Sequence, residues 1–574
     1  MWLRLKSMIM DQNQAAKSRT LKRLQVGGLP LIHAIAERMR LKEILYKYMP
    51  AHGNEEIPAV ETLMLLVYNL IVGKDPLYEL QQWVESLDFR CINNEDYENV
   101  KFTDDRFGRV LNKLYLVDRA SLMTELVVFF VKEFDITLER LSNDSTSIKA
   151  FGRYPGRTRT GLELKKGISK DHRPDLKQLV FSLSIAGDGA VPIHYKCYPG
   201  NVTDDTTHIE TWNSLLKITG CPDFLYVADC KLCTDGQLSY IVDNRGRAVT
   251  IIPETWNEVE SFKEKLRKTK KAKDIIWRRR KPGSHDKKEY FSAFRGDYFT
   301  AKRGYKIHWI YSSEKRKRDR ENRDKHLKKV EQCLAELNGK INKRGLKTST
   351  AIEEAAQQIV KEQQLEDFFH ISIGTITEKY QVQIGTGRPG KNTKYRTRVN
   401  TLYTLSWTQK KQALKQEAQT DGVFPLLCTD KELTAKEVLK AYKYQPRLEK
   451  RFSQFKKFHN AAPLLFKKIE HIEANMFGFF IALVIQALIE REIRNEMKAQ
   501  KIEKIRVYPE QREASHPTTA KILDRFENIC TYKIKENSKV VETFKDSLNE
   551  DQKLVLDLLN IEENEYWRSP SQSK

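Results

Sequence analysis

Side chains that could hold a metal ion or a phosphate recur at helical spacing in AYKYQPRLEKRFSQFKKFHN, which spans residues 441–460. Separations of three, four and seven residues return a side chain to one face of an α-helix, and they relate the residues Tyr442, Gln445, Glu449 and Lys456. Because proline is tolerated in the first turn of a helix but not in its interior, the helix is predicted to begin at Pro446. Its apolar surface would come from three aromatic residues: Phe452, Phe455 and Phe458. On this stretch alone, an ordinary basic amphipathic helix is the better interpretation.

Two aspartates end predicted strands farther upstream. Asp144 closes the predicted strand ITLERLSND, and Asp229 closes the predicted strand FLYVAD. Open α/β sheets expose their sites at strand ends, so the two carboxylates and Glu449 would form an all-oxygen pocket suited to Mg²⁺, with Mn²⁺ as a substitute. Two such ions roughly 3.5–4 Å apart can hold both the attacking and the leaving oxygen of a phosphodiester. For either aspartate alone, a role in a turn or as a helix cap is the simpler interpretation.

The chain as a whole carries a strong positive charge. Its 574 residues include 100 Lys and Arg against 77 Asp and Glu, which gives a net charge of +23 and a pI near 9.4. Such a surplus favours a polyanionic partner, with nucleic acid as the first candidate, although solvated basic faces are also common. The eight Cys are scattered, as expected in a reduced compartment. The apolar run Met476–Ile489 is short for a membrane span, so we expect a buried helix and no membrane partner.

Composition and periodicity divide the chain into segments. Apolar residues at helical spacing predict helices near the N-terminus, whereas strands that alternate with helices later in the chain predict a mixed α/β layer. The predicted segments are a basic leader (1–25), a helical N-terminal domain for DNA binding or assembly (26–135), the first part of the α/β core (136–260), an inserted β-rich basic domain (261–419), the second part of the core with the Glu449 helix (420–499) and a mixed helical tail (500–574).

Several ordered motifs resemble one family of enzymes. The motifs are GISKDHRPDLKQ (167–178), GNVTDDTT (200–207), DGVFPLLCTD (421–430) and ALIEREIR (487–494). Together with the spacing of Tyr442, Glu449 and Lys456, they are similar to the bacterial insertion-sequence transposases of the DDE class. The resemblance is to the subgroup marked by a Tyr-Arg-Glu-Lys signature and a β-rich insertion before the Glu.

The resemblance implies both a fold and a set of site residues. It implies a ribonuclease-H-like catalytic core in which Asp144, Asp229 and Glu449 bind the metal ions. It also implies that Tyr442 and Lys456 hold phosphates near the scissile bond. Three basic residues between the first two predicted strands could grip the DNA backbone or belong to a solvated loop; they are Lys170, Arg173 and Lys177.

The sequence departs from the family pattern at two positions. Gln445 stands where the signature has Arg, and Asn475 stands where many relatives have His. Arg447 lies two residues after Gln445 and could bind DNA in place of the signature Arg. On a regular helix, however, Arg447 points away from Glu449.

These features predict a multidomain protein with an α/β ribonuclease-H-like catalytic core, interrupted by a β-rich basic insertion and preceded by an all-α N-terminal domain. The predicted activity is that of a Mg²⁺-dependent DNA transposase, which cuts insertion-sequence ends and transfers 3′-OH strands to target DNA. The alternatives are a metal-dependent DNA nuclease of the same fold and a catalytically inactive, transposase-derived DNA-binding protein. The expected partners are double-stranded DNA with inverted repeats at the element ends, target DNA and a second copy of the chain in a synaptic homodimer. The expected location is the cytoplasm, at the nucleoid.

Overall fold

The computed structural model describes residues 19–53, 55–92, 100–167, 173–280, 288–343, 345–458, 466–536 and 539–568. The chain divides into two compact units: the first unit contains residues 1–250 and 440–574, and the second unit contains residues 251–439. The second unit therefore extends past the predicted insertion (261–419) at both ends. One reason is that strand β12 (Val423–Cys428), predicted to belong to the core, pairs with β9 (Lys306–Ser312) of the second unit.

A mixed sheet forms the centre of the first unit. Its described strands are β2 (Arg140–Ala150), β3 (Lys177–Ala186), β4 (Pro192–Pro199), β5 (Leu225–Val227) and β6 (Arg247–Ile251). They lie in the order β4-β3-β2-β5-β6. The first three pair antiparallel, whereas β5 pairs parallel with both β2 and β6. Parallel neighbours need a crossover connection, and helix α9 (Asp235–Asp243) connects β5 to β6 while α8 (His208–Thr219) precedes β5. The predicted alternation of strands and helices is confirmed as a mixed α/β layer.

Strand β2 starts and ends later than predicted. The polar run SNDSTS suggests a strand end, but the structure keeps it in the ladder and pairs Asp144 with Leu183 of β3. The buried amide of Asn143 makes this favourable, because it donates to Ser182 Oγ (3.0 Å), the Leu183 carbonyl (3.1 Å) and Ser184 Oγ (2.9 Å). Buried polar groups with such partners avoid most of the cost of desolvation. Asp144 thus lies within the strand and not at its end, which corrects the prediction.

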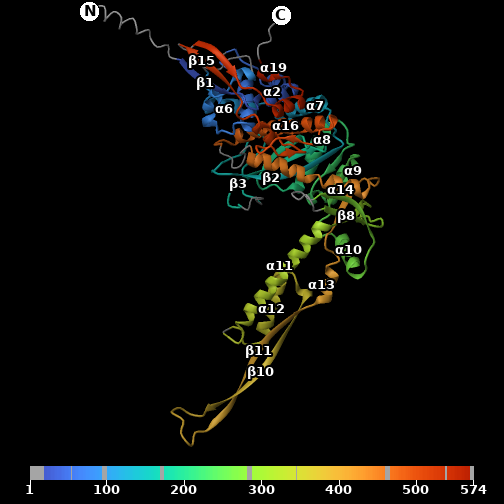
Figure 1. Ribbon diagram of the computed structural model, residues 1–574. Coiled ribbons are helices and arrows are strands. Elements are labelled where there is room, and N and C mark those ends of the chain that lie inside the picture. The colour runs from blue at the N-terminus through green and yellow to red at the C-terminus, as the bar shows by residue number, and fades with distance from the viewer. Residues whose placement is uncertain are drawn as a thin grey trace, which may run out of the picture. The chain divides into compact units, whose positions relative to one another are not determined.

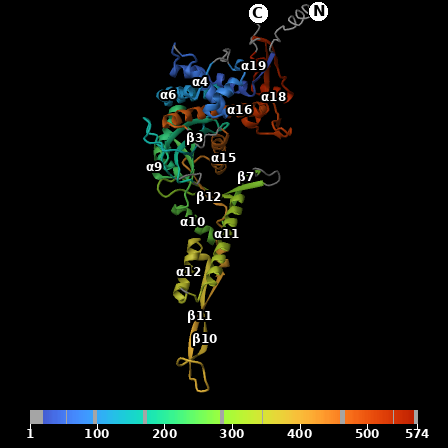
Figure 2. The ribbon, with the colours of Figure 1, turned by 90° about the vertical axis from the view of Figure 1, so that its left-hand side faces the viewer.

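Helix α16 (Ile469–Ala499) is the core helix of the first unit (Figures 1 and 2). It packs against α2, α4 and α6 of the N-terminal segment and against β4. Among the described residues it is the helix whose length and composition would allow it to cross a membrane, yet its most apolar stretch is entirely buried inside the protein. The buried helix predicted around Met476–Ile489 is therefore confirmed. The helices of the N-terminal segment are α2 (Leu29–Arg38), α3 (Leu41–Tyr48), α4 (Ala59–Ile71), α5 (Leu80–Glu85), α6 (Asp104–Leu116) and α7 (Arg119–Glu133).

Segments from the two ends of the described chain share a sheet. Strand β1 (Arg19–Gln25) pairs antiparallel with β15 (Cys530–Glu536), which pairs in turn with β16 (Lys539–Lys545). The prediction of a basic leader over residues 1–25 therefore does not hold for residues 19–25. These residues form a strand in the same unit as the N-terminal helices. The other elements of the tail are β13 (Ile505–Arg506), β14 (Glu513–Ala514), α17 (Thr519–Asp524), α18 (Glu550–Leu558) and α19 (Glu563–Trp567). The tail is thus mixed, and not mainly helical.

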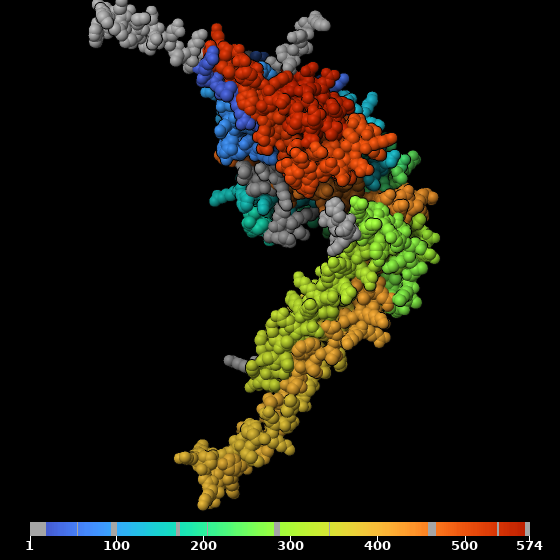
Figure 3. All heavy atoms as spheres, in the orientation of Figure 1, coloured from blue at the N-terminus to red at the C-terminus, as the bar shows by residue number. Residues whose placement is uncertain are grey.

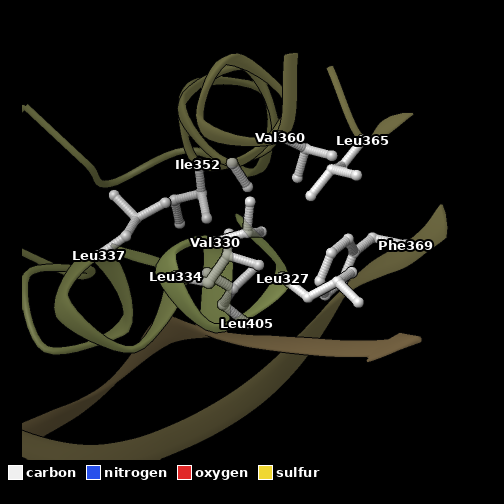
Figure 4. Close-up of a cluster of buried hydrophobic side chains, with 10 residues drawn as sticks. Leu327, Val330, Leu334, Leu337, Ile352, Val360, Leu365, Phe369 and Leu405 are labelled. Carbon is white, nitrogen blue, oxygen red and sulfur yellow. The ribbon is translucent and has the colours of Figure 1, made fainter. Parts of the chain in front are cut away.

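The second unit combines an antiparallel sheet with helices and a long β-hairpin. Its sheet has the order β12-β9-β8-β7. The remaining elements are β7 (Lys273–Arg280), β8 (Lys288–Phe294), α10 (Asn257–Lys268), α11 (Ser313–Asn338), α12 (Ser349–Glu362), β10 (Phe369–Gln383), β11 (Tyr395–Gln409) and α13 (Lys411–Glu417). Leu327, Val330, Ile352, Phe369 and Leu405 join α11, α12 and the base of the hairpin in one buried cluster (Figure 4). Beyond this cluster, most hairpin side chains are exposed (Figure 3).

Candidate active site

The parallel pairing of β2 with β5 brings two predicted carboxylates to neighbouring positions. The register pairs Ser142 with Val227, and Asp144 and Asp229 each follow these residues by two positions. Because side chains alternate across a strand, residues two apart share a face of the sheet. The strand β5 itself ends at Val227, and Asp229 caps the next helical turn by accepting a hydrogen bond from the backbone N–H of Lys231 (3.0 Å). Asp229 therefore caps a helical turn, which is the role considered for a lone aspartate. It also occupies the position that corresponds to Asp144 in the register of β2 and β5.

Two short helices carry the other predicted site residues. Helix α14 (Ala435–Tyr442) ends at Tyr442, and α15 (Gln445–Ser453) begins at Gln445 with Pro446 in its first turn. The predicted helix start is confirmed to within one residue, which is the usual uncertainty of a helix boundary. Helix α15 packs against β2 and β3, and its buried side chains include Leu448 and Phe452.

The pKa of the Tyr442 hydroxyl is raised by burial and by negative charge. Burial raises the pKa of Tyr442 above its ordinary value, and the negative charges of Asp229, Asp144 and Glu449 raise it further, because they disfavour the phenolate. The hydroxyl of Tyr442 therefore keeps its proton and can donate a hydrogen bond to an anion.

The three carboxylates differ in exposure. Asp144 is half-buried, the side chain of Asp229 is 38% exposed, and Glu449 is exposed. Glu449 forms no side-chain hydrogen bond or ion pair with another described residue. Within the described ranges, no three His, Cys, Asp or Glu side chains already lie in an arrangement that could hold a metal ion. The donor atoms suit Mg²⁺ in kind, but a bound ion would require the carboxylates to draw together, so the metal remains a prediction.

A buried histidine that was not among the predicted site residues lies beside Asp229. His208 places Nδ1 at 2.9 Å from the hydroxyl of Tyr226 and Nε2 at 4.0 Å from Asp229 Oδ1. On the other side, the Thr250 hydroxyl donates to the Asp229 carbonyl (2.6 Å). These neighbours restrict the position of Asp229. His208 begins α8 directly after the motif GNVTDDTT, and that adjacency is the sequence signal that could have identified it.

A buried arginine fixes α15 from its other side. Arg451 is 3% exposed, and it donates from Nε to the Ala190 carbonyl (2.9 Å) and from Nη2 to the Gly189 carbonyl (3.1 Å). Its Nη1 lies 3.1 Å from the buried carboxylate of Glu490 on α16. Glu490 belongs to the motif ALIEREIR. This part of the motif therefore ties the helix that carries Glu449 to the core helix.

The helix changes pitch before Lys456. A π turn occupies residues 454–458, and its hydrogen bonds run from i to i+5 where those of an α-helix run from i to i+4. The prediction that Lys456 lies on the same helix face as Glu449, seven residues earlier, requires a continuous α-helix. The wider turn therefore alters the direction of Lys456. Buried Phe455 anchors the turn by stacking on Phe181 of β3, with ring centroids 4.5 Å apart. Of the three aromatic residues predicted to be apolar surface, Phe452 and Phe455 are confirmed, and the side chain of Phe458 lies outside the described part.

The residues at the variant signature positions lie in different surroundings. Gln445 lies on the same side of α15 as Glu449, while Arg447 lies on the opposite side and lines a separate pocket. Asn475 is buried within α16. Gln445 thus shares a helix side with Glu449, whereas Arg447 does not.

The basic residues predicted to grip DNA have partners within the chain wherever the structure describes them. Arg173 forms two hydrogen bonds with Asp175, at 2.8 and 2.7 Å, and holds the pKa of that carboxyl at about 2. Lys177 donates to two backbone carbonyls at residues 153–154. Lys170 lies outside the described residues. Arg173 and Lys177 would have to exchange these partners in order to bind DNA phosphates.

A family model matches the N-terminal part of the chain. Residues 21–128 match DUF4277, a domain of unknown function. No curated protein matches the chain. The matched stretch ends before Asp144, so it includes none of the three carboxylates.

Proposed function

We propose that the protein is a metal-dependent DNA transposase with a ribonuclease-H-like core, which cuts the ends of an insertion sequence and joins them to target DNA. The observation that carries the proposal is the parallel pairing of β2 with β5, whose register places Asp144 and Asp229 two positions beyond the paired residues Ser142 and Val227, while the helix that carries Glu449 packs against β2. The order and directions of strands β2 to β6 support a core of this kind. The net charge of +23 suits a nucleic-acid substrate.

The side chains supply what phosphoryl transfer needs. Asp144, Asp229 and Glu449 would hold Mg²⁺, which when bound stabilises charge on the phosphate and makes an attacking water or 3′-OH more acidic. The Tyr442 hydroxyl would donate a hydrogen bond to a phosphate oxygen, and the Lys456 ammonium would balance its negative charge. The protein thus contributes position and charge and forms no covalent bond to DNA.

Each proposed step exchanges one bond at phosphorus. First, a water oxygen attacks the phosphorus at the element end, the bond to the 3′-oxygen breaks, and that oxygen is protonated. This leaves a 3′-OH and a 5′-phosphate. Next, the new 3′-OH loses its proton, its oxygen attacks a phosphorus of the target, and the target strand leaves with a protonated 3′-oxygen. No oxidant or reductant is needed, because each step makes one phosphorus–oxygen bond and breaks another.

The proposal includes the assembly and the place of action. Two element ends must be held together before they can be joined, and a homodimer offers two equivalent sites related by symmetry. The substrates are chromosomal, so the protein would act in the cytoplasm at the nucleoid.

The test is a cleavage and joining assay with the full-length protein. The substrate is a supercoiled plasmid that carries the DNA flanking both ends of the reading frame, and Mg²⁺ is present or replaced by EDTA. The variants are Asp144→Asn, Asp229→Asn and Glu449→Gln, which remove charge at nearly constant shape. Asp243→Asn, an exposed aspartate at the end of α9, is the matched control. Each site variant is expected to lower the rate of cleavage by roughly 10³-fold, which corresponds to about 4 kcal/mol, while DNA binding persists.

The products separate the proposal from its alternatives. Nicked and joined products that require Mg²⁺ and all three carboxylates support a transposase. Nicks without joined products indicate a nuclease, and bound but uncut DNA indicates an inactive DNA-binding protein. Cleavage that survives in one of the three variants removes that residue from the proposed site.

A further inference from the structure

Helix α15 has a second, strongly basic face. At about 100° per residue, Arg447, Lys450 and Arg451 lie on the side of the helix opposite Gln445 and Glu449. This basic face borders a pocket of about 720 Å³ within the first unit. The other walls come from the turn between β3 and β4, from α16 and from the segment that leads into α17.

The pocket concentrates positive charge. Among the described residues that line it, Arg447, Lys450, Arg451 and Arg494 are cationic, and Glu490 is the carboxylate that faces them. Glu490 is already shared, because Arg451 approaches its carboxylate at 3.1 Å and Arg494 at 3.3 Å. One carboxylate cannot neutralise four cations, so the pocket keeps a net positive charge at neutral pH.

Part of the donor capacity in the pocket is unused. Neither the Arg447 nor the Lys450 side chain forms a hydrogen bond or ion pair with another described residue. The Nε of Arg494 is buried and has no hydrogen-bond partner among the described atoms. Buried donors without partners are costly, so the pocket is suited to a ligand with several acceptor oxygens.

The cations also disfavour one another. Burial lowers the pKa of Lys450, and the positive charges of Arg447 and Arg494 lower it further. Burial and the same charges lower the pKa of His516, which also lines the pocket. A bound anion would remove this repulsion and would favour the charged forms of both residues.

We propose that this pocket is a phosphate-binding site, which takes a phosphate group either from a nucleic-acid backbone or from a small phosphorylated molecule. Guanidinium groups donate in pairs to phosphate oxygens, and the ammonium of Lys450 adds a compact charge. The volume lies in the range of pockets that hold whole small-molecule ligands, which leaves room for the groups attached to the phosphate.

The phosphate site is distinct from the carboxylate site, because the two lie on opposite faces of α15. If the phosphate belongs to DNA, the inference rests on the proposed function and adds a second point at which α15 holds a strand. If it belongs to a small molecule, the inference is independent of DNA cleavage.

The test compares the full-length protein with the double variant Arg447→Gln/Lys450→Gln. Glutamine keeps polarity and most of the side-chain length while removing the charge. Lys217→Gln, at an exposed lysine on α8 without a described side-chain partner, is the matched control. Binding of sodium pyrophosphate is measured by calorimetry, and binding of a short DNA duplex is measured by fluorescence anisotropy over a range of salt concentrations. Circular dichroism checks that each variant is folded.

Wild type and the control are expected to bind pyrophosphate, and the double variant is expected to bind it about tenfold more weakly or worse, as loss of charged hydrogen bonds implies. If pyrophosphate does not bind, but the folded double variant binds DNA about tenfold more weakly and with a shallower salt dependence, the pocket takes backbone phosphate. The inference is overturned if wild type binds neither probe, if the double variant binds both as well as wild type, or if Lys217→Gln weakens binding equally. Failure of DNA cleavage with pyrophosphate binding intact would refute the proposed function and leave the phosphate site standing.

Discussion

The two faces of helix α15 are held in different ways. On the acidic face, Glu449 is exposed and has no side-chain partner among the described residues. On the basic face, Arg451 is buried and bonded to two carbonyls and to Glu490. Arg451 thus helps to fix the helix from its basic side, while the exposed Glu449 side chain on the acidic side can reorient toward a ligand. The position of Glu449, the proposed metal-binding carboxylate on α15, therefore depends on the contacts of Arg451, which contain no reacting group.

The largest effect on stability is expected from Arg451→Met, which removes the contacts that hold the basic face of α15. This change leaves the Ala190 and Gly189 carbonyls without their donor and removes one partner of the buried Glu490. Loss of one partner of a buried ion pair costs about 3–5 kcal/mol, which urea denaturation followed by circular dichroism would measure. The exposed pair Arg512–Glu510 supplies the control, since Arg512→Met should change stability by less than about 1 kcal/mol. An Arg451→Met protein as stable as the control would show that the anchor is dispensable.

A smaller loss of stability is expected from Asn143→Ala, which acts on β2, the strand against which α15 packs. The change removes the donor to Ser182, Leu183 and Ser184 and should cost about 1–3 kcal/mol. Because Asp144 is the next residue on β2, cleavage should fall more than DNA binding does. Asn495→Ala, at an exposed position of α16, should stay within about 0.5 kcal/mol of wild type. Unchanged stability and unchanged cleavage in Asn143→Ala would show that the hydrogen bonds of Asn143 do not support the site that contains Asp144.

A still smaller effect is expected from Tyr442→Phe, which keeps the half-buried ring and removes the hydroxyl. Because its raised pKa keeps that hydroxyl protonated, it can act as a donor but not as a base. Single-turnover cleavage should slow about tenfold, equivalent to about 1.4 kcal/mol. The dependence of the rate on pH below 9 should keep its shape. A rate as low as that of Glu449→Gln would give the hydroxyl a larger role than hydrogen bonding.

The smallest effect is a shift in the titration of His516, which reports on the basic face alone. Removing the charge of Lys450 with Lys450→Gln should raise the pKa of His516, because one of the positive charges that lower it is gone. The lowered pKa also means that the unfolded chain binds more protons, so stability falls as the pH drops through the ordinary histidine value near 6.5. Lys450→Gln should therefore weaken the dependence of stability on pH. Proton NMR of the imidazole measures the shift, and a fall of the same size in the pKa of His516 in Glu449→Gln would show that the two faces are not electrically separate.

Local sequence patterns were sufficient to predict the helix that carries Glu449 and the short strand that leads to Asp229. Pro446 marks the first turn of α15 as predicted, because proline can occupy that position without losing a hydrogen bond. The short apolar strand before Asp229 forms as predicted, although it ends at Val227 and not at Asp229. Both features depend on residues close together in the chain, which is why periodicity and turn chemistry were enough.

Features that depend on distant partners could not be predicted in this way. The polar run around Asp144 suggests a strand end unless the hydroxyls of Ser182 and Ser184 are known to face Asn143. Lys456 fits an α-helical spacing, but the π turn depends on Phe455 meeting Phe181 on another element. The basic pocket likewise forms only when α15 and α16 are packed together.

The pairing of β1 with β15 imposes a delay during synthesis. Arg19 and Glu536 pair in this sheet although 517 residues separate them. At common rates of translation, the first strand leaves the ribosome on the order of a minute before the second one exists. During that interval its backbone edge is open to any other strand that can pair with it. A prematurely terminated chain would keep that edge permanently, so truncated products should be markedly more prone to self-association than the intact protein.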